Sequence, residues 1–176
     1  MVGDILVNVV IVIAVTSLIG YLTSSALKSK PTIDAGTGAR TFIYTRGLKV
    51  LALISLVMPA FMGAVFLSFY FGGESDYEVW LVTCLIFAAM SAYQLLEAFS
   101  ARLIVSEREI TSLSPWTGKR TFQWKEIDSI RYSTLSRWHI IVGPSGKKIY
   151  ASDYLSGAAE LSTEFRTRIP PEKWRK

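Results

Sequence analysis

The sequence has little of the chemistry on which enzymes and metal sites depend. It contains one cysteine, Cys84, and one histidine, His139, among 176 residues. A lone cysteine excludes an internal disulfide framework, and the Cys and His spacing of a zinc site is absent. Cys84 lies in an apolar run, where we interpret it as a small packing residue. His139 has no sequence neighbour that suits a general base or a metal ligand, so we expect no enzyme, no metal and no cofactor.

Charge is scarce in the first half of the chain and abundant in the second. Residues 1–99 hold 5 of the 19 Lys and Arg residues and 6 acidic residues, whereas residues 100–176 hold 14 basic and 8 acidic residues, a formal net charge of +6. Such asymmetry predicts that the first part of the chain lies in lipid and that the second lies in water, next to a negatively charged partner or surface. The second half has no basic helix and no platform of stacking aromatic residues, so nucleic acid is not an expected partner.

Three long apolar runs carry no charged residue. They comprise residues 5–22, 50–71 and 79–96, which are 18, 22 and 18 residues long. About 20 apolar residues in a helix span the hydrocarbon core of a bilayer. The first run is not interpreted as a signal peptide, because the stretch before it, MVGD, is acidic and the run is longer than the apolar part of a signal. We therefore predict three transmembrane helices, at about residues 5–27, 48–71 and 78–99.

Two residues in these runs bear on function. Pro59 lies in the middle of the second run and predicts a kink in the helix. Because proline is common in membrane helices, we interpret this kink as structural rather than as a gating hinge. Glu97 lies at the end of the third run, where it is expected to reach water. We therefore expect no proton relay within the spans.

The loops between the runs predict how the chain is oriented. Residues 24–49 carry five basic residues against one acidic residue, Asp34, and residues 72–78, GGESDYE, carry three acidic residues and no basic one. Because basic flanks stay in the cytoplasm, we place the amino terminus outside and both the loop 28–47 and the tail inside. The loop is expected to be flexible. Its end, TFIYTR at residues 41–46, either adds a strand to the tail domain or lies at an interface.

After residue 100 the pattern changes to that of strands and one helix. Alternation in RTFQWKEIDSIRYST, residues 120–134, predicts a half-buried sheet. With turns at PWTGK and PSGKK, the predicted strands are 102–107, 109–114, 120–124, 129–134, 137–143 and 148–152. An apolar period of three or four predicts a helix over 156–169, capped by Ser156 and stopped by Pro170. The expected core residues are Phe122, Trp124, Ile127, Ile130, Trp138 and Ile140.

These features resemble the bacterial pleckstrin-homology-like domain over residues 100–170. The resemblance rests on the opening RLIVSEREI, the turn SPWTGKR, the segment FQWKEIDSI and the closing GKKIYASDYLSGAAELSTEF. In that family an aromatic residue, an acidic step and an isoleucine lead into the fourth strand, positions that are held here by Trp124, Glu126, Ile127 and Ile130.

The resemblance implies a fold and a location. The expected fold is a transmembrane region over 1–99 and a cytoplasmic α+β domain over 100–170, in which antiparallel strands form a small barrel capped by one C-terminal helix. Residues 171–176 are expected to be a tail. Such domains often follow membrane helices in small bacterial proteins, so the expected location is the bacterial cytoplasmic membrane, spanned several times.

Lipid contact is a further expectation. Eukaryotic relatives that bind phosphoinositides have a basic cluster in the first hairpin, whereas that link is SERE here, with two acidic residues around Arg108. Other turns carry Lys119, Arg120, Lys147 and Lys148. We predict that these four side chains contact anionic lipid headgroups of any kind, and the alternative is that they are simply solvated.

Two functions remain open from the sequence. The favoured hypothesis is a membrane-anchored, non-enzymatic interaction module whose domain binds a partner protein or peptide, or another copy of the chain, next to the inner leaflet. This hypothesis rests on the absence of catalytic and metal-binding motifs from the sequence and on a predicted sheet that can accept an added strand. The alternative is a small transport or channel component with a regulatory tail. The near absence of ionisable residues in the spans argues against the alternative.

Overall fold

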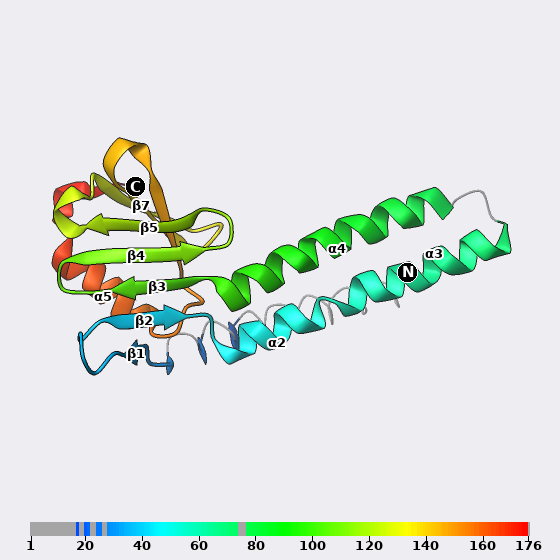
Figure 1. Ribbon diagram of the computed structural model, residues 1–176, viewed down its shortest axis with the longest axis horizontal. Helices are drawn as coiled ribbons and strands as arrows, with labels where there is room; N and C mark the ends of the chain where they lie inside the picture. Colours follow the sequence, from blue (N-terminus) through cyan, green and yellow to red (C-terminus); the bar gives the residue numbers. More distant parts are fainter. Residues whose placement is uncertain (1–16, 18–19, 22–23, 26–27, 74–76, 176) are drawn as a thin grey trace, which may run out of the picture.

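The computed structural model describes residues 17, 20–21, 24–25, 28–73 and 77–175 and has two parts (Figure 1). A hairpin of long helices extends from one end of a domain built of strands. One arm of the hairpin is α2 (Arg46–Ile54) continued by α3 (Val57–Gly72), and the other arm is α4 (Tyr77–Ser100). The first predicted span, at residues 5–27, lies for the most part outside the described residues.

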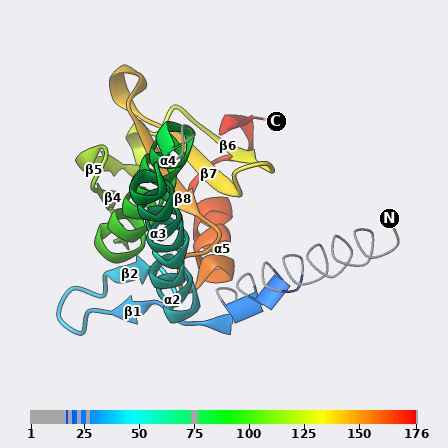
Figure 2. The same ribbon diagram turned by 90° about the vertical axis from the view of Figure 1, so that its right-hand side faces the viewer.

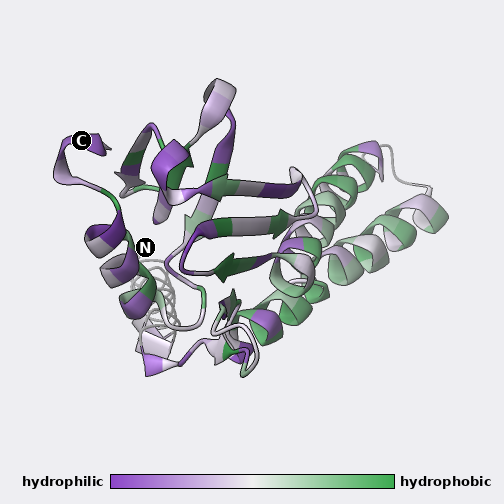
Figure 3. Ribbon diagram, turned by 60° about the vertical axis from the view of Figure 1, so that its left-hand side comes forward, coloured by the Kyte–Doolittle hydropathy of each residue, from purple (hydrophilic) through white to green (hydrophobic). Residues whose placement is uncertain are grey.

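Both arms of the hairpin are long and apolar enough to cross a membrane. They comprise 27 residues, Arg46–Gly72, and 24 residues, Tyr77–Ser100, and only 6% of the apolar window of each is buried inside the protein. Many apolar side chains of the hairpin are therefore exposed. Figure 3 shows that the hairpin is mostly hydrophobic, whereas the domain mixes hydrophobic and hydrophilic residues. Exposed apolar surface on this scale marks a region that meets a membrane or another protein.

The break between α2 and α3 follows from Pro59. Proline has no N–H, so the carbonyl of Ser55, four residues earlier, lacks its helical donor. The hydroxyl of Ser91 on α4 donates to this carbonyl at 2.8 Å, and the thiol of Cys84 donates to the Pro59 carbonyl at 3.4 Å. The helix is thus interrupted where the sequence predicts a kink, and the neighbouring helix supplies the missing donor.

The strands form two sheets. The first is antiparallel, with the order β1-β2-β3-β4-β5. Its strands are β1 (Thr32–Ile33), β2 (Arg40–Ile43), β3 (Arg102–Val105), β4 (Glu109–Ser114) and β5 (Gly118–Gln123). The second sheet has the order β8-β7-β6-β9, and β9 runs parallel to β6. Its strands are β6 (Ser129–Ser133), β7 (Trp138–Val142), β8 (Lys148–Ser152) and β9 (Trp174–Arg175).

The segment 28–47 is part of the first sheet rather than a flexible loop. Asp34 closes the turn between β1 and β2, because its Oδ1 accepts hydrogen bonds from the backbone N–H groups of Gly36 at 2.8 Å and Thr37 at 3.0 Å. These bonds lower the pKa of the Asp34 carboxyl. β2 pairs with β3 and places Phe42, which is fully buried, in the core. Of the two alternatives for residues 41–46, the added strand is the one observed.

The expected closed barrel is not formed by the described residues. Figure 2 shows β4 and β5 on one side of the domain, and β6 and β7 on the other. Outside the packed core, isolated hydrogen-bonded contacts join the two halves of the domain. At one corner the guanidinium of Arg120 donates to the Lys148 carbonyl at 2.6 Å, and at another Tyr44 forms an isolated bridge with Leu155. The six predicted strands are present as β3 to β8, but no continuous ladder joins their two groups.

The core lies between the sheets and α5 (Ala158–Arg168). Of the six expected core residues, Trp138 is the exception, since it is only half-buried. β7 is apolar on both faces, and the face packed in the core carries Ile141 instead. The helix begins later than predicted, at Ala158, because Gly157 with φ 72° precedes it. Ser156 does not cap the helix, and its backbone N–H donates to the Ile43 carbonyl at 2.7 Å.

Three short 3-10 turns complete the domain. They are η1 (Trp124–Glu126), η2 (Pro144–Gly146) and η3 (Pro171–Lys173). Trp124 therefore lies in a turn rather than in a strand, yet it is buried as predicted and its indole N–H donates to the Ser106 carbonyl at 3.0 Å. Residues 171–175 follow α5 and contribute η3 and β9, which returns the chain to the second sheet.

Candidate functional site

A groove between α5 and the second sheet gathers most of the chemistry of the domain. It has a volume of about 500 Å³. β6 and β7 contribute Tyr132 and His139, the turn after β8 contributes Asp153, α5 contributes Arg166, and β9 contributes Trp174. The groove thus combines aromatic surface with donors, an acceptor and a basic side chain, which is the composition typical of ligand sites.

Asp153 is the centre of this cluster. The hydroxyl of Tyr132 donates to its Oδ2 at 2.6 Å, and the Nε of Arg137 lies 3.8 Å from the same oxygen. The Nδ1 of His139 lies 3.6 Å from Oδ1, which is too long for a hydrogen bond. The register of the strands creates the cluster, because Tyr132 pairs with His139 across β6 and β7, and the backbone N–H of Asp153 donates to the Arg137 carbonyl.

The electrostatics of the groove keep His139 neutral at pH 7. Burial lowers the pKa of the His139 imidazole, and Arg166 lowers it further, whereas the Asp153 carboxylate opposes them. Burial and the hydrogen bond to Asp153 raise the pKa of Tyr132, so its hydroxyl stays a donor. A neutral imidazole beside a carboxylate is one element of a general base. The hydroxyl of Thr163 in the groove, however, donates within α5 to the Ala159 carbonyl at 3.0 Å and is not activated by His139.

Sequence reasoning missed this cluster because its members are far apart along the chain. Asp153 follows His139 by 14 residues and becomes its neighbour through the hairpin of β7 and β8, where His139 pairs with Ala151. The sequence did contain a signal. The turn PSGKK between the two strands sets which residues pair on either side of it. From this register, Asp153 is expected to lie near His139.

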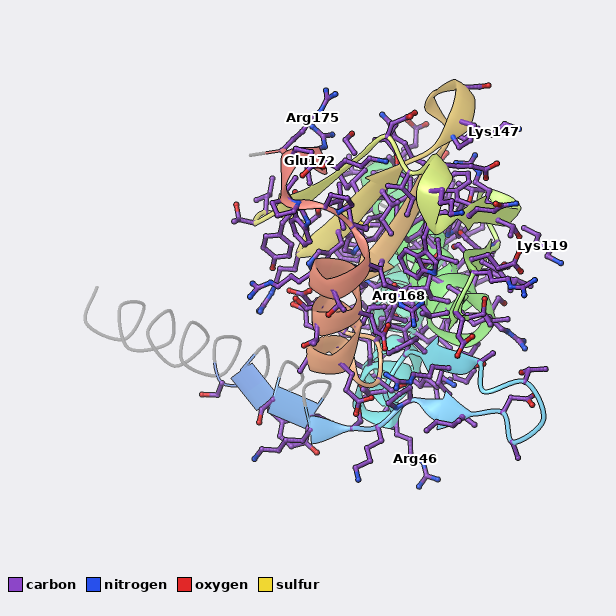
Figure 4. The ribbon with its side chains drawn as sticks, turned by 90° about the vertical axis from the view of Figure 1, so that its left-hand side faces the viewer. Arg46, Lys119, Lys147, Arg168, Glu172 and Arg175 are labelled. Atoms are coloured by element: carbon purple, nitrogen blue, oxygen red, sulfur yellow. The ribbon has the colours of Figure 1, made fainter. Side chains whose placement is uncertain are left out.

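The four predicted lipid contacts lie along the edges of β5 and β8. The structure brings Arg120 and Lys148 together through the hydrogen bond described above, while Lys119, Lys147 and Lys148 are exposed. Lys119 and Lys147 project from the same flank of the domain (Figure 4). Their contact with lipid stays a prediction.

A second group of residues joins the domain to the helices. A pocket of about 240 Å³ lies between α2, α4 and the second sheet, and is lined by Tyr44 and Glu97 among others. The hydroxyl of Tyr44 donates to Glu97 at 3.2 Å, and the ring of Trp116, in the turn between β4 and β5, stacks on Tyr93 of α4 at 4.6 Å. Glu97 does not simply reach water as expected, since its second carboxylate oxygen is buried without a hydrogen-bond partner in the described part of the chain.

Burial, and next to it the charge of Glu97, raises the pKa of the Tyr44 hydroxyl, which is therefore a donor at any physiological pH. The hydrogen bond and the stacked rings are direct contacts between the domain and α4.

Comparison of the chain with protein-family models, with curated proteins and with solved structures finds no match. The function has to be argued from the geometry of this chain alone.

Proposed function

We propose that the chain is a membrane-anchored, non-enzymatic interaction protein whose cytoplasmic, pleckstrin-homology-like domain binds an extended acidic peptide of a partner protein. Two sheets followed by a C-terminal helix support this type of domain. The basic residues of the segment 28–47 support its cytoplasmic orientation. The peptide lies along β6, beside the groove of Tyr132, His139 and Asp153.

The observation that carries the proposal is the open edge of β6. β9 pairs with β6 only through Ile130 and Arg131, so Tyr132 and Ser133 have a strand on one side alone in the described structure. Such an edge offers backbone groups to an extended peptide, and pockets beside the edge read its alternate side chains. Tyr132 lies on that edge and also lines the groove.

The charges around this edge favour an acidic peptide. Arg131 and Arg175 are register partners of β6 and β9, so two like charges face each other across the pair. On the other face of the sheet, Arg166 borders the groove. None of the three guanidinium groups forms an ion pair with any side chain that the structure describes. Acidic side chains of a peptide that lies along β6 beyond β9 would offset this repulsion.

The helices are better suited to anchoring than to transport. Within the two candidate spans the Asp, Glu, Lys and Arg side chains are Arg46, Lys49, Glu78 and Glu97, all within the first or last turn of a span. Ion and proton pathways need such groups at depth. The spans therefore hold the domain at the membrane surface.

Site-directed cross-linking tests the proposal. A photo-reactive amino acid replaces Thr134, which is exposed directly after β6, and in a control replaces Glu107, which is exposed between β3 and β4. In native membranes we expect one stoichiometric partner to cross-link at residue 134 and not at 107. Adding Arg131→Glu should abolish this product, while Arg131→Lys should retain it. Equal cross-linking at both positions, or a product insensitive to Arg131→Glu, would contradict the proposal.

A further inference from the structure

A third pocket, on the side of the domain where the helices begin, carries a surplus of positive charge. It has a volume of about 380 Å³ and is lined by Lys30, Arg46 and Lys49, together with Thr45. No Asp or Glu is among the described residues that line it. None of the three cations forms an ion pair with a described residue, and Lys49 lies over the ring of Phe99 at 5.5 Å. Figure 4 shows Arg46 projecting from the domain on a different side from Lys119 and Lys147.

The start of α2 adds further donors to this pocket. Its first helical hydrogen bond is made by the N–H of Lys49 to the Thr45 carbonyl, so the N–H groups of residues 46–48 have no helical acceptor. No side chain caps this end, and no acidic residue lies in the first turn. The amino end of a helix attracts anions through these N–H groups and the helix dipole.

A second, independent feature of this pocket is a buried polar group that lacks a partner. Thr45 is 7% exposed, and its hydroxyl is buried with no hydrogen-bond partner among the residues described. A hydroxyl left unpaired in this way is costly and uncommon in native proteins. A ligand with acceptor oxygens, held by the three cations, would satisfy it.

We propose that this pocket binds the phosphate group of an anionic phospholipid. Phosphate has the acceptor oxygens and the negative charge that Thr45, the end of α2 and the basic side chains require. Arg46 is the first residue of a candidate membrane span, so the pocket lies at the depth of the headgroups. This site is separate from the groove beside β6, and either proposal can fail without the other.

The experiment uses the full chain in nanodiscs made of phosphatidylcholine alone or with one-fifth phosphatidylglycerol. Melting temperature and the lipid that remains bound in native mass spectrometry are the two measurements. The double variant Arg46→Gln/Lys49→Gln should bind the anionic lipid about 30-fold more weakly, as expected for two charges near the headgroups. The matched variant Arg108→Gln/Lys125→Gln removes two exposed charges elsewhere and should change binding less than about threefold by the same measure.

Thr45→Val distinguishes a bound ligand from general attraction. The exchange removes the unpaired hydroxyl, so the variant should melt at the same or a higher temperature in phosphatidylcholine, yet gain less than the wild type from phosphatidylglycerol. Inorganic phosphate and pyrophosphate serve as soluble controls. Added to the protein in phosphatidylcholine nanodiscs, they should not change its melting temperature. Stabilisation by these soluble ions but not by the lipid would overturn the assignment to lipid. Equal losses in the two double variants, or an undiminished lipid gain in Thr45→Val, would overturn the site.

Discussion

Replacing Trp124 by alanine should unfold the domain while the helices stay in the membrane. The indole is 8% exposed, packs 6.4 Å from the ring of Phe165 and lies under the guanidinium of Arg168 at 5.3 Å. Truncating a buried Trp typically costs about 3–5 kcal/mol. The exchange also removes the donor for the Ser106 carbonyl, worth about 1 kcal/mol or more. Because small domains have only about 5–15 kcal/mol in total, the loss takes a large share of the stability.

The assay is thermal unfolding of the full chain in detergent, together with trypsin digestion of the domain. We expect Trp124→Ala to lower the melting temperature by about 10 °C or more. Trp124→Phe keeps most of the packing and loses the N–H, so its shift should be a fraction of that. Leu135→Ala is the surface control, because Leu135 is 98% exposed. A melting temperature for Trp124→Ala equal to that of Leu135→Ala would refute the assignment of Trp124 to the core.

Three further predictions concern other parts of the molecule. Ser91→Ala removes the donor to the Ser55 carbonyl and should destabilise the helical hairpin by about 0.5–2 kcal/mol, measured by unfolding in mixed detergent. The pKa of His139 is lowered in the folded state, so the unfolded chain takes up the proton first and stability should fall as pH drops below about 6.5. His139→Gln should flatten this fall between pH 7.5 and 5, measured as melting temperature. Charge reversal at Lys147 and Lys148 should weaken the binding of anionic vesicles at low salt and have little effect at 1 M salt, in a flotation assay of protein in nanodiscs.

Each of these outcomes has a clear opposite. An unchanged hairpin in Ser91→Ala would mean that the Ser55 carbonyl finds another donor. An acid-induced loss that persists in His139→Gln would contradict its assignment to the imidazole. Vesicle binding that is insensitive to Lys147 and Lys148 would favour the alternative that these lysines are only solvated.

The core shows where sequence periodicity is informative and where it is not. The helix face formed by Leu161, Phe165 and Ile169 was predicted by its spacing, and all three residues are buried. In β7 the sequence WHIIV is apolar at nearly every position, so alternation cannot say which face meets the core. The packing of the sheet decided the matter, because Trp138 lines the pocket at the junction and Ile141 lies in the core.

The sequence by itself determined the local elements: two long apolar helices, the interruption at Pro59, six strands and a terminal helix. Each depends on residues within a turn or two along the chain, through hydrophobic spacing or a missing N–H. Only the tertiary structure decided which distant segments meet. It joined β1 and β2 to β3, returned β9 to β6, set Asp153 beside His139, and left the Thr45 hydroxyl unpaired among cations. Apart from the hairpin of β7 and β8, which the turn PSGKK marks, these contacts depend on strand register and on packing between sheets, which no local pattern encodes, and the proposed sites are built from them.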